Sequence, residues 1–228
     1  MKISYIAFGL ALMPTIASAA SEKPITQKNV KAYIGWDVNW FNGNLNNKLG
    51  EDFSAGTGYL YNVNSDELIN PKYIGFTVNA GAKINDYFGI ETFYQNTGNS
   101  KSTIDFYDTL GTTKISQYKS KTSFWAFGLD ALGYLPITDS KFSFIGSLGL
   151  GYYNTKGTFD IINYVYNISE TEKDTEKNIG LRIGFGGQYD FAEHWAARAM
   201  IKYAALNSDN DDAVDGVLDI SFGVKYIF

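Results

Sequence analysis

The stretch that decides the fold closes the chain: residues 217–228 read VLDISFGVKYIF. From Leu218 to Phe228 every second side chain is apolar, and the positions between them up to Lys225 are polar, charged or glycine. Side chains of a β-strand point alternately to opposite faces, so this pattern predicts a strand with one apolar face and one polar face.

Seven further segments show the same alternation along the chain. They are residues 31–41, 73–84, 88–95, 123–135, 142–152, 178–190 and 195–203. The composition agrees, because 17 Tyr, 16 Phe and 4 Trp favour strands, 23 Gly supply turns, and only 4 Pro interrupt them. The sequence therefore predicts an all-β, eight-stranded antiparallel up-and-down transmembrane β-barrel.

The connections between these segments alternate between short and long. Residues 85–87, 136–140 and 192–194 are short and rich in turn formers, whereas residues 42–72, 96–122, 154–177 and 205–216 are longer polar stretches. Short turns on one side and long loops on the other are typical of bacterial outer-membrane barrels. We expect both termini and the short turns on the periplasmic side, and four long loops outside the cell.

The first residues predict export. Lys2 precedes an apolar run from Ile3 to Ile16, and residues 17–20 (ASAA) offer small side chains for signal peptidase. The run is too short for a membrane-spanning helix, which needs about 20 apolar residues. We expect a signal peptide over residues 1–20 and a barrel over residues 21–228. The net charge of −5 indicates no nucleic-acid partner.

The two faces of the strands differ in a way that favours a lipid environment outside. The apolar face carries almost no charge, and the other face mixes glycine with isolated acids and bases, as a narrow lumen requires. We expect the inward charges to form a network of salt bridges, although a continuous water path is the alternative. They are Asp37, Lys83, Glu91, Asp130, Arg182, Arg198, Lys202, Asp219 and Lys225.

Aromatic side chains gather near the ends of the expected strands. Such belts mark the two membrane interfaces of a barrel. General aromatic enrichment of strands is the alternative, and the ordering of these residues by strand end favours the belts over it. The residues expected to form them are Trp40, Trp125, Trp195, Tyr94, Tyr152, Tyr189 and Tyr203. Trp36 lies in the middle of its segment, which this interpretation does not explain.

The final segment resembles the terminal targeting strand of outer-membrane barrels, in Phe222, Val224, Tyr226 and Phe228. Together with the segments around residues 83–88 and 129–136, the mature chain resembles the small OmpA-like and opacity-type porin family throughout its length. The resemblance implies the outer membrane of a Gram-negative bacterium as the location, and the outer-membrane insertion machinery as a partner that reads the terminal strand. Unlike full-length OmpA, this sequence ends at Phe228, so we expect no peptidoglycan-binding domain and no tethering to the cell wall.

Enzymatic and metal-binding interpretations have little support in the residues. The single histidine, His194, falls in an expected periplasmic turn, away from the outer leaflet where related deacylases and acyltransferases act. The acidic run 209–212 is more consistent with a solvated loop than with a Ca²⁺ site. We expect no catalysis, cofactor or metal.

Three functions from different classes fit this pattern. The first is a structural or adhesin-like role, in which extracellular loops contact host or cell-surface molecules. Its aromatic candidates are Phe53, Tyr59, Tyr61, Phe106, Tyr107, Tyr164 and Tyr166, which could equally belong to strands that protrude as hairpins, with Tyr118 in one of them. The second is a narrow diffusion channel for ions or small solutes, and the third is a soluble periplasmic ligand-binding barrel. The first two also require contact with outer-membrane lipid and lipopolysaccharide.

Overall fold

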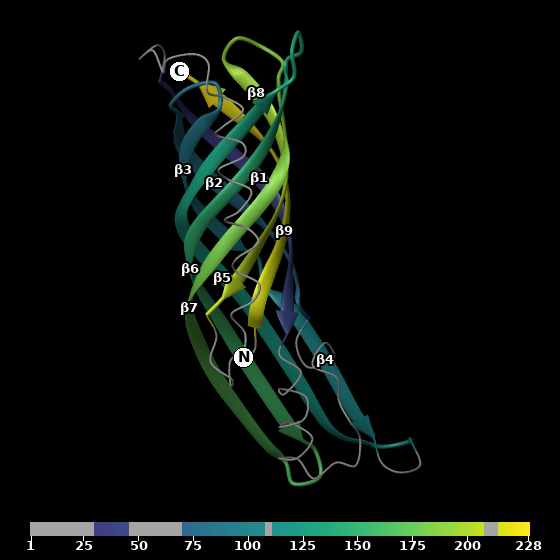
Figure 1. Cartoon of the computed structure of the whole chain (residues 1–228). Coiled ribbons are helices and arrows are strands. Elements are labelled where there is room, and N and C mark those ends of the chain that lie inside the picture. Colours follow the sequence, from purple (N-terminus) through teal and green to yellow (C-terminus); the bar gives the residue numbers. More distant parts are fainter. Residues whose placement is uncertain (1–29, 46–69, 108–110, 208–213) are drawn as a thin grey trace, which may run out of the picture.

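The computed structural model describes residues 30–45, 70–107, 111–207 and 214–228. They form one antiparallel sheet that closes into a barrel (Figure 1). Its strands are β1 (Lys31–Leu45), β2 (Lys72–Lys83), β3 (Phe88–Thr97), β4 (Ser100–Tyr107), β5 (Lys114–Pro136), β6 (Phe142–Asn163), β7 (Ile168–Asp190), β8 (Trp195–Leu206) and β9 (Val214–Ile227). Among the described residues, no helix is long and apolar enough to cross a membrane, a finding that does not concern spans made of strands.

The barrel wall closes where the last strand meets the first. β9 pairs with β1 along Tyr33↔Ile227 to Leu45↔Val214, and each other strand pairs with its sequence neighbour, except that β3 and β4 both pair with β5. β3 and β4 follow one another along the same edge of β5. The nine strands therefore occupy eight strand positions in the barrel wall. The predicted barrel class is confirmed, with one more strand than expected.

The interruption between β3 and β4 has a local cause at Thr97. Its hydroxyl donates to the Phe124 carbonyl oxygen at 3.0 Å and accepts from the Phe124 backbone N–H at 2.9 Å. A side chain thus replaces the backbone ladder at this point. Pairing with β5 resumes at Ser100↔Thr122, after an unequal number of residues on the two strands, as in a β-bulge.

Three strands are much longer than the sequence pattern indicated. β5, β6 and β7 have 23, 22 and 23 residues, whereas β2 and β8 have 12 each. A tilted strand crosses a membrane with about 9–11 residues. The pairing of β7 with β8 ends at Gly180↔Leu206, so the first part of β7 pairs with β6 alone. The expected loops 96–122 and 154–177 are therefore largely strand.

These extensions form a protruding sheet, which we define as β4 together with residues 114–123 of β5, 155–163 of β6 and 168–177 of β7. In Figure 1 it leaves the barrel at the end opposite the C-terminus. The short turns β2–β3, β5–β6 and β7–β8 lie at the C-terminal end of the barrel. Residues 46–69 and 208–213, which include the predicted loop residues Phe53, Tyr59 and Tyr61 and the acidic run, lie outside the described residues, as does the expected signal peptide.

Candidate functional site

The interior of the barrel holds a band of charged side chains. Of the nine charged residues predicted to face inward, eight are buried: Asp37, Glu91, Asp130, Asp219, Arg182, Arg198, Lys202 and Lys225. Four are acids and four are bases, so the buried charges balance. Burying an ion is costly unless an opposite charge and hydrogen bonds accompany it, and such pairing is possible here.

Glu91 on β3 is the centre of this charge band. Its carboxylate accepts from the Arg198 guanidinium at 2.7 Å and lies 3.1 Å from the Lys225 ammonium. It also accepts from the Tyr33 hydroxyl at 3.0 Å. Glu91 faces Asp130 directly across the β3–β5 ladder, where two like charges alone would repel. The surrounding bases offset that repulsion.

The two carboxylates nearest to Glu91, those of Asp37 and Asp130, also contact basic side chains. Arg198 also donates to Asp37 at 2.5 Å. Lys202 lies 3.1 Å from Asp130, and Arg182 lies 3.6 Å from it. Two guanidinium groups and one ammonium therefore link strands that are far apart in the sequence.

Asp219 and Lys83 differ from the rest. Asp219 has no ion pair within 4.0 Å among the described residues, and amides of Asn39 and Gln95 donate to it at 2.7 and 2.9 Å. Lys83 is only half-buried, and its ammonium lies 4.9 Å from the ring centre of Tyr134. Lys83 thus stands at the edge of the lumen, outside the charge band.

Glycines create the space that the charge band occupies. Across the strand ladders, Asp37 and Arg198 both face Gly223, Asp130 and Arg182 both face Gly149, Glu91 faces Gly81, Lys202 faces Gly184, and Lys225 faces Gly35. A Cβ atom at Gly149 would collide with an Asp130 carboxylate oxygen, and one at Gly223 with an Asp37 carboxylate oxygen. Glycine thus makes room in the lumen for both acids and bases, as the mixed inner face of the strands indicated.

Apolar side chains close the lumen on both sides of the charge band. One cluster near the C-terminal end of the barrel holds Tyr33, Leu132, Tyr134, Ile145 and Met200. The other, toward the protruding sheet, holds Phe41, Tyr73, Phe93, Phe124, Ala126, Tyr153, Ala204 and Val217. The expectation that water-averse side chains point outward was therefore incomplete, because aromatic side chains also fill the ends of the interior.

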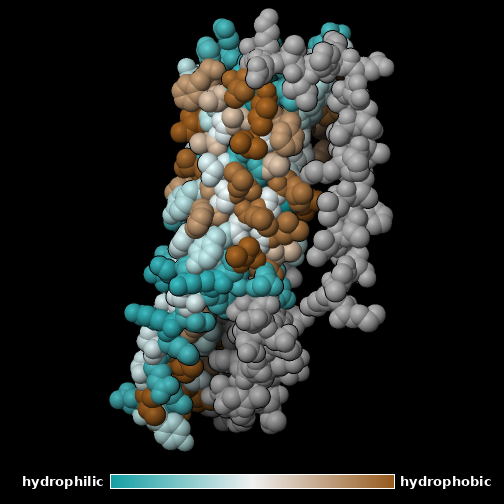
Figure 2. Space-filling model, turned by 60° about the vertical axis from the view of Figure 1, so that its left-hand side comes forward, coloured by the Kyte–Doolittle hydropathy of each residue, from teal (hydrophilic) through white to brown (hydrophobic). Residues whose placement is uncertain are grey.

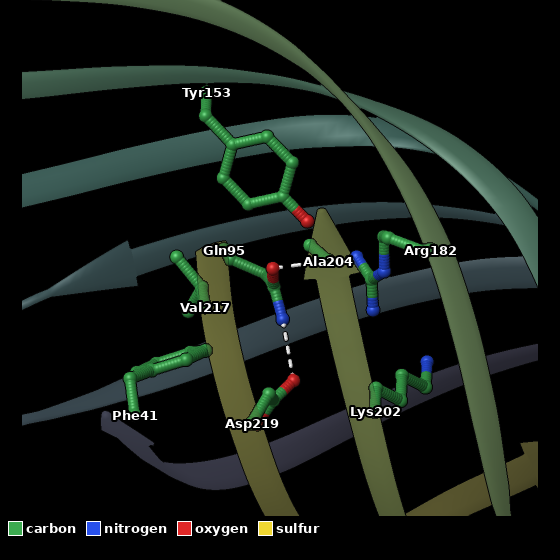
Figure 3. Close-up of a pocket in the computed structure, with 8 residues that line it drawn as sticks. All are labelled: Phe41, Gln95, Tyr153, Arg182, Lys202, Ala204, Val217 and Asp219. Carbon is green, nitrogen blue, oxygen red and sulfur yellow. Dashed lines mark hydrogen bonds between the residues drawn. The ribbon is translucent and has the colours of Figure 1, made fainter. Parts of the chain in front are cut away.

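A small pocket lies where this second cluster meets the charge band (Figure 3). Gln95 joins the two sides there: its amide donates to Asp219, and its carbonyl oxygen accepts from Arg182 at 3.3 Å. The Arg182 guanidinium also lies 3.6 Å from the ring centre of Phe93. The space between these groups is too small for a water molecule. Packing thus continues from the charged band into the aromatic cluster.

The outward face of the barrel is apolar. Figure 2 shows hydrophobic residues over the barrel surface, followed by a hydrophilic band and then the protruding sheet. Five of the predicted belt residues are exposed on this surface, and Trp125 and Tyr152 are half-buried against one another with ring centres 5.7 Å apart. Trp36 is also exposed, in the middle of the outer surface. In the terminal strand Phe222, Val224 and Phe228 point outward, and Tyr226 packs on Trp195.

The end of the protruding sheet is held together by a tip cluster of Asp105, Lys114, Gln117 and Tyr164. The Lys114 ammonium lies 2.7 Å from the Asp105 carboxylate, and the Gln117 amide donates to that carboxylate at 2.7 Å. These bonds lower the pKa of Asp105 and raise the pKa of Lys114. The Tyr164 hydroxyl donates to Gln117 at 3.4 Å, which joins the β4–β5 end to the β6–β7 turn.

The β6–β7 turn exposes apolar side chains beyond this cluster. Asn163 closes the turn by accepting from the backbone N–H groups of Val165 and Tyr166 at 3.0 and 3.1 Å. Asn167 has a φ of 51°, a left-handed conformation that Asn tolerates in tight turns. We define the tip patch as the exposed side chains of Tyr107, Tyr164, Val165, Tyr166 and Ile168, of which Tyr166 is 74% exposed.

His194 lies in the β7–β8 turn, at the end opposite the tip patch. Its Nδ1 is 2.9 Å from the Ile227 carbonyl oxygen, and its ring stacks on Tyr226. It therefore contacts the terminal strand. Within the described ranges, no group of three or more histidines and acids is arranged to hold a metal ion.

A family comparison identifies this architecture. The model of the outer membrane protein beta-barrel domain matches residues 8–228. The chain belongs to this family. It is therefore a protein of the bacterial outer membrane, and the predicted family, fold class and location are confirmed. No curated protein sequence matches this outer-membrane barrel.

Solved structures share the fold at low identity. A major outer membrane protein from Thermus thermophilus is 12% identical with a TM-score of 0.51, covering 86% of this chain and 99% of its own. OprG from Pseudomonas aeruginosa is 14% identical (TM-score 0.47, 90% and 99% covered). Ail, the attachment invasion locus protein of Yersinia pestis, solved with the heparin analogue sucrose octasulfate, is 14% identical (TM-score 0.47, 88% and 99% covered). At such identities the likeness to the Thermus protein concerns the fold alone.

Sequence reasoning gave protruding strands only as one of two alternatives for the long connections, and it missed the tip cluster. Polar residues occur on both faces of the extensions, so their alternation of apolar and polar residues is weak. The signal available was the β-branched and aromatic content of residues 158–166, which favours a strand. Tyr118, for which a protruding strand was one of the alternatives, lies in β5 and is buried.

Proposed function

We propose that this outer-membrane barrel is a non-catalytic surface-interaction protein, adhesin-like in action, that binds cell-surface molecules through its tip patch. The observation that carries the proposal is the position of that patch, at the end of a protruding sheet whose side chains are cross-linked by the tip cluster. About ten ladder pairs beyond the barrel place it roughly 30 Å from the wall at about 3.3 Å per residue.

The physical reason is the combination of exposure and order. Contiguous exposed apolar side chains rimmed by polar ones mark interaction sites on soluble surfaces. Tyrosine offers a large amphipathic contact area at low cost in conformational entropy. The bonds of Asn163 order the backbone of the turn, and the Tyr164 hydroxyl is tied to the tip cluster through Gln117, so less freedom is lost on binding.

Adhesion of whole cells tests the proposal. A non-adherent Gram-negative laboratory strain that displays the protein is expected to adhere to cultured epithelial cells, and the triple variant Val165→Ser/Tyr166→Ser/Ile168→Ser is expected to fall to the level of the empty strain. Loss of a central aromatic contact typically costs at least about 2 kcal/mol, or roughly thirtyfold in affinity. Bound cells are counted after washing.

A matched control is available on the short turns. Tyr87, Ile137 and Phe191 are also exposed, at the opposite end of the barrel. Their triple replacement by Ser removes the same kind of surface on the periplasmic side and is expected to leave adhesion unchanged. Adhesion that survives the tip variant, or that the wild-type protein never confers, would disprove the tip as the binding site.

A further inference from the structure

The two faces of the protruding sheet carry opposite charges. Residues 168–177 of β7 read ISETEKDTEK, in which the acids occupy even positions and the lysines odd ones. Odd positions of β7 share the face of Ile179, Leu181 and Ile183, which are exposed on the outer surface of the barrel. The lysines of β7 therefore lie on the continuation of the lipid-facing surface, and its acids lie on the opposite face.

Tyr118 provides independent evidence for this sidedness. It is buried on the inner face and stacks on Phe159, which faces Glu172 across the β6–β7 ladder. Burial raises the pKa of Tyr118, and the nearby charge of Glu172 raises it further. The acidic side chains of β7 therefore lie on the inner face of the protruding sheet.

The strand ladders bring the outer-face lysines together. Lys101 faces Lys121 across β4–β5, Lys121 faces Thr158 across β5–β6, and Thr158 faces Lys173 across β6–β7. Lys156 lies one step closer to the barrel, and Lys177 lies one step closer again, opposite Asn154. We define the lysine patch as Lys101, Lys121, Lys156, Lys173 and Lys177, all of which are exposed.

Among the residues that the structure describes, no acid lies on the outer face in the three cross-strand rows that contain the lysine patch. The next level outward holds Asp160, which accepts from the Thr171 hydroxyl at 2.6 Å and faces Lys119. Asp105 lies further out, in the tip cluster. Lysines that face each other directly across a ladder, as Lys101 and Lys121 do, repel one another. A bound anion would offset this repulsion.

The lysine patch begins where the apolar surface ends. Lys121 and Lys156 lie four residues beyond the belt residues Trp125 and Tyr152 on their own strands, and Lys177 lies two residues before the apolar Ile179. At about 3.3 Å per residue, Lys121 and Lys156 lie about 13 Å along their strands from these belt residues, and Lys177 lies about 7 Å from Ile179. This is the level of lipid headgroups, and Figure 2 shows a hydrophilic band directly after the hydrophobic surface.

We propose that the lysine patch binds the phosphate groups of a phosphorylated glycolipid of the outer leaflet, with the Thr158 hydroxyl between Lys121 and Lys173 as an additional donor. Lysine is a phosphate ligand that acts as a point charge, and its attraction to an anionic membrane surface adds up over several residues. Because the patch continues the lipid-facing surface, a molecule anchored in the leaflet reaches it without crossing the barrel. Such binding would hold the base of the protruding sheet against the membrane. The site is separate from the tip patch, so either proposal can fail alone.

Titration of the folded protein with lipid A tests this site. The isotope-labelled mature protein in zwitterionic micelles is titrated with diphosphorylated lipid A, and amide chemical shifts are recorded. The expected shifts centre on Thr158 and its cross-strand neighbours. The variant Lys121→Gln/Lys173→Gln is expected to weaken the apparent affinity roughly ten- to thirtyfold, from the loss of two charges near an anionic surface.

The control is Lys31→Gln/Lys141→Gln, which removes two exposed lysines at the opposite end of the barrel and should leave the affinity unchanged. A heat-dependent gel shift verifies that each variant is folded. Three results would overturn the proposal: equal affinity in the patch variant, equal shifts with lipid A that lacks phosphates, or binding at the patch that inorganic phosphate or a sulfated polysaccharide reproduces at lower concentration.

Discussion

At the scale of single residues, the charge band depends on glycines that face its members. Gly149 lies opposite both Asp130 and Arg182, and a Cβ atom there would collide with an Asp130 carboxylate oxygen and the Leu129 carbonyl oxygen. We expect Gly149→Ala to lower the free energy of unfolding by about 1–3 kcal/mol, as overpacking of a filled interior does. Urea-induced unfolding in lipid vesicles measures the change.

The same strand provides a matched control. Gly146 also lies in β6, but a Cβ atom there meets nothing within 4 Å. Gly146→Ala is therefore expected to be neutral or to stabilise by about 0.5–1 kcal/mol, because alanine restricts the unfolded chain. Equal effects of the two substitutions would mean that lumen crowding does not determine the requirement for glycine.

At the scale of the structural element, the end of the protruding sheet depends on pH through the tip cluster. The hydrogen bonds from Lys114 and Gln117 hold the pKa of Asp105 below its ordinary value. A lowered pKa stabilises the folded tip above the unfolded value of about 4, and this contribution is lost as pH falls through the lower folded value. The raised pKa of Lys114 acts in the opposite sense: its contribution is complete below about pH 10.4 and is lost as pH rises through the higher folded value.

Titration of the Asp105 carboxyl carbon by NMR measures this coupling. We expect Lys114→Gln to move the midpoint upward, toward the ordinary value, because the strongest hydrogen bond to the carboxylate is weakened. Lys141→Gln, at the other end of the barrel, should leave the midpoint where it is. An Asp105 midpoint that does not respond to Lys114→Gln would show that the ion pair does not persist in solution.

At the scale of the whole molecule, the filled lumen distinguishes a membrane anchor from a channel. Aromatic clusters at both ends and balanced charges between them occupy the interior of the described barrel. We expect the purified protein to give no sustained openings in planar bilayers in which a known porin gives regular current steps. Steady openings of the wild-type protein would favour the alternative function, a narrow diffusion channel.

The sequence by itself determined the class of barrel, because period-two alternation and a terminal aromatic strand depend only on the order of residues. It also identified the charges that face inward. Whether Asp37 or Arg198 points to the inner or the outer face depends only on its place in the alternation along its own strand. The alternation failed at residues 96–122 and 154–177, where polar residues occur on both faces of the strands. Local patterning could not separate these strands from loops.

Only the tertiary structure decided which charges meet. Glu91 joins Arg198 and Lys225 because closure of β1 on β9 sets the stagger of the whole sheet, and a shift by one residue would turn every side chain to the other face. The same register brings Lys101, Lys121 and Lys173 into one row across four strands and places the acids of β7 behind them. These sites are assembled from residues far apart in the chain, so their geometry exists only once the strands have paired.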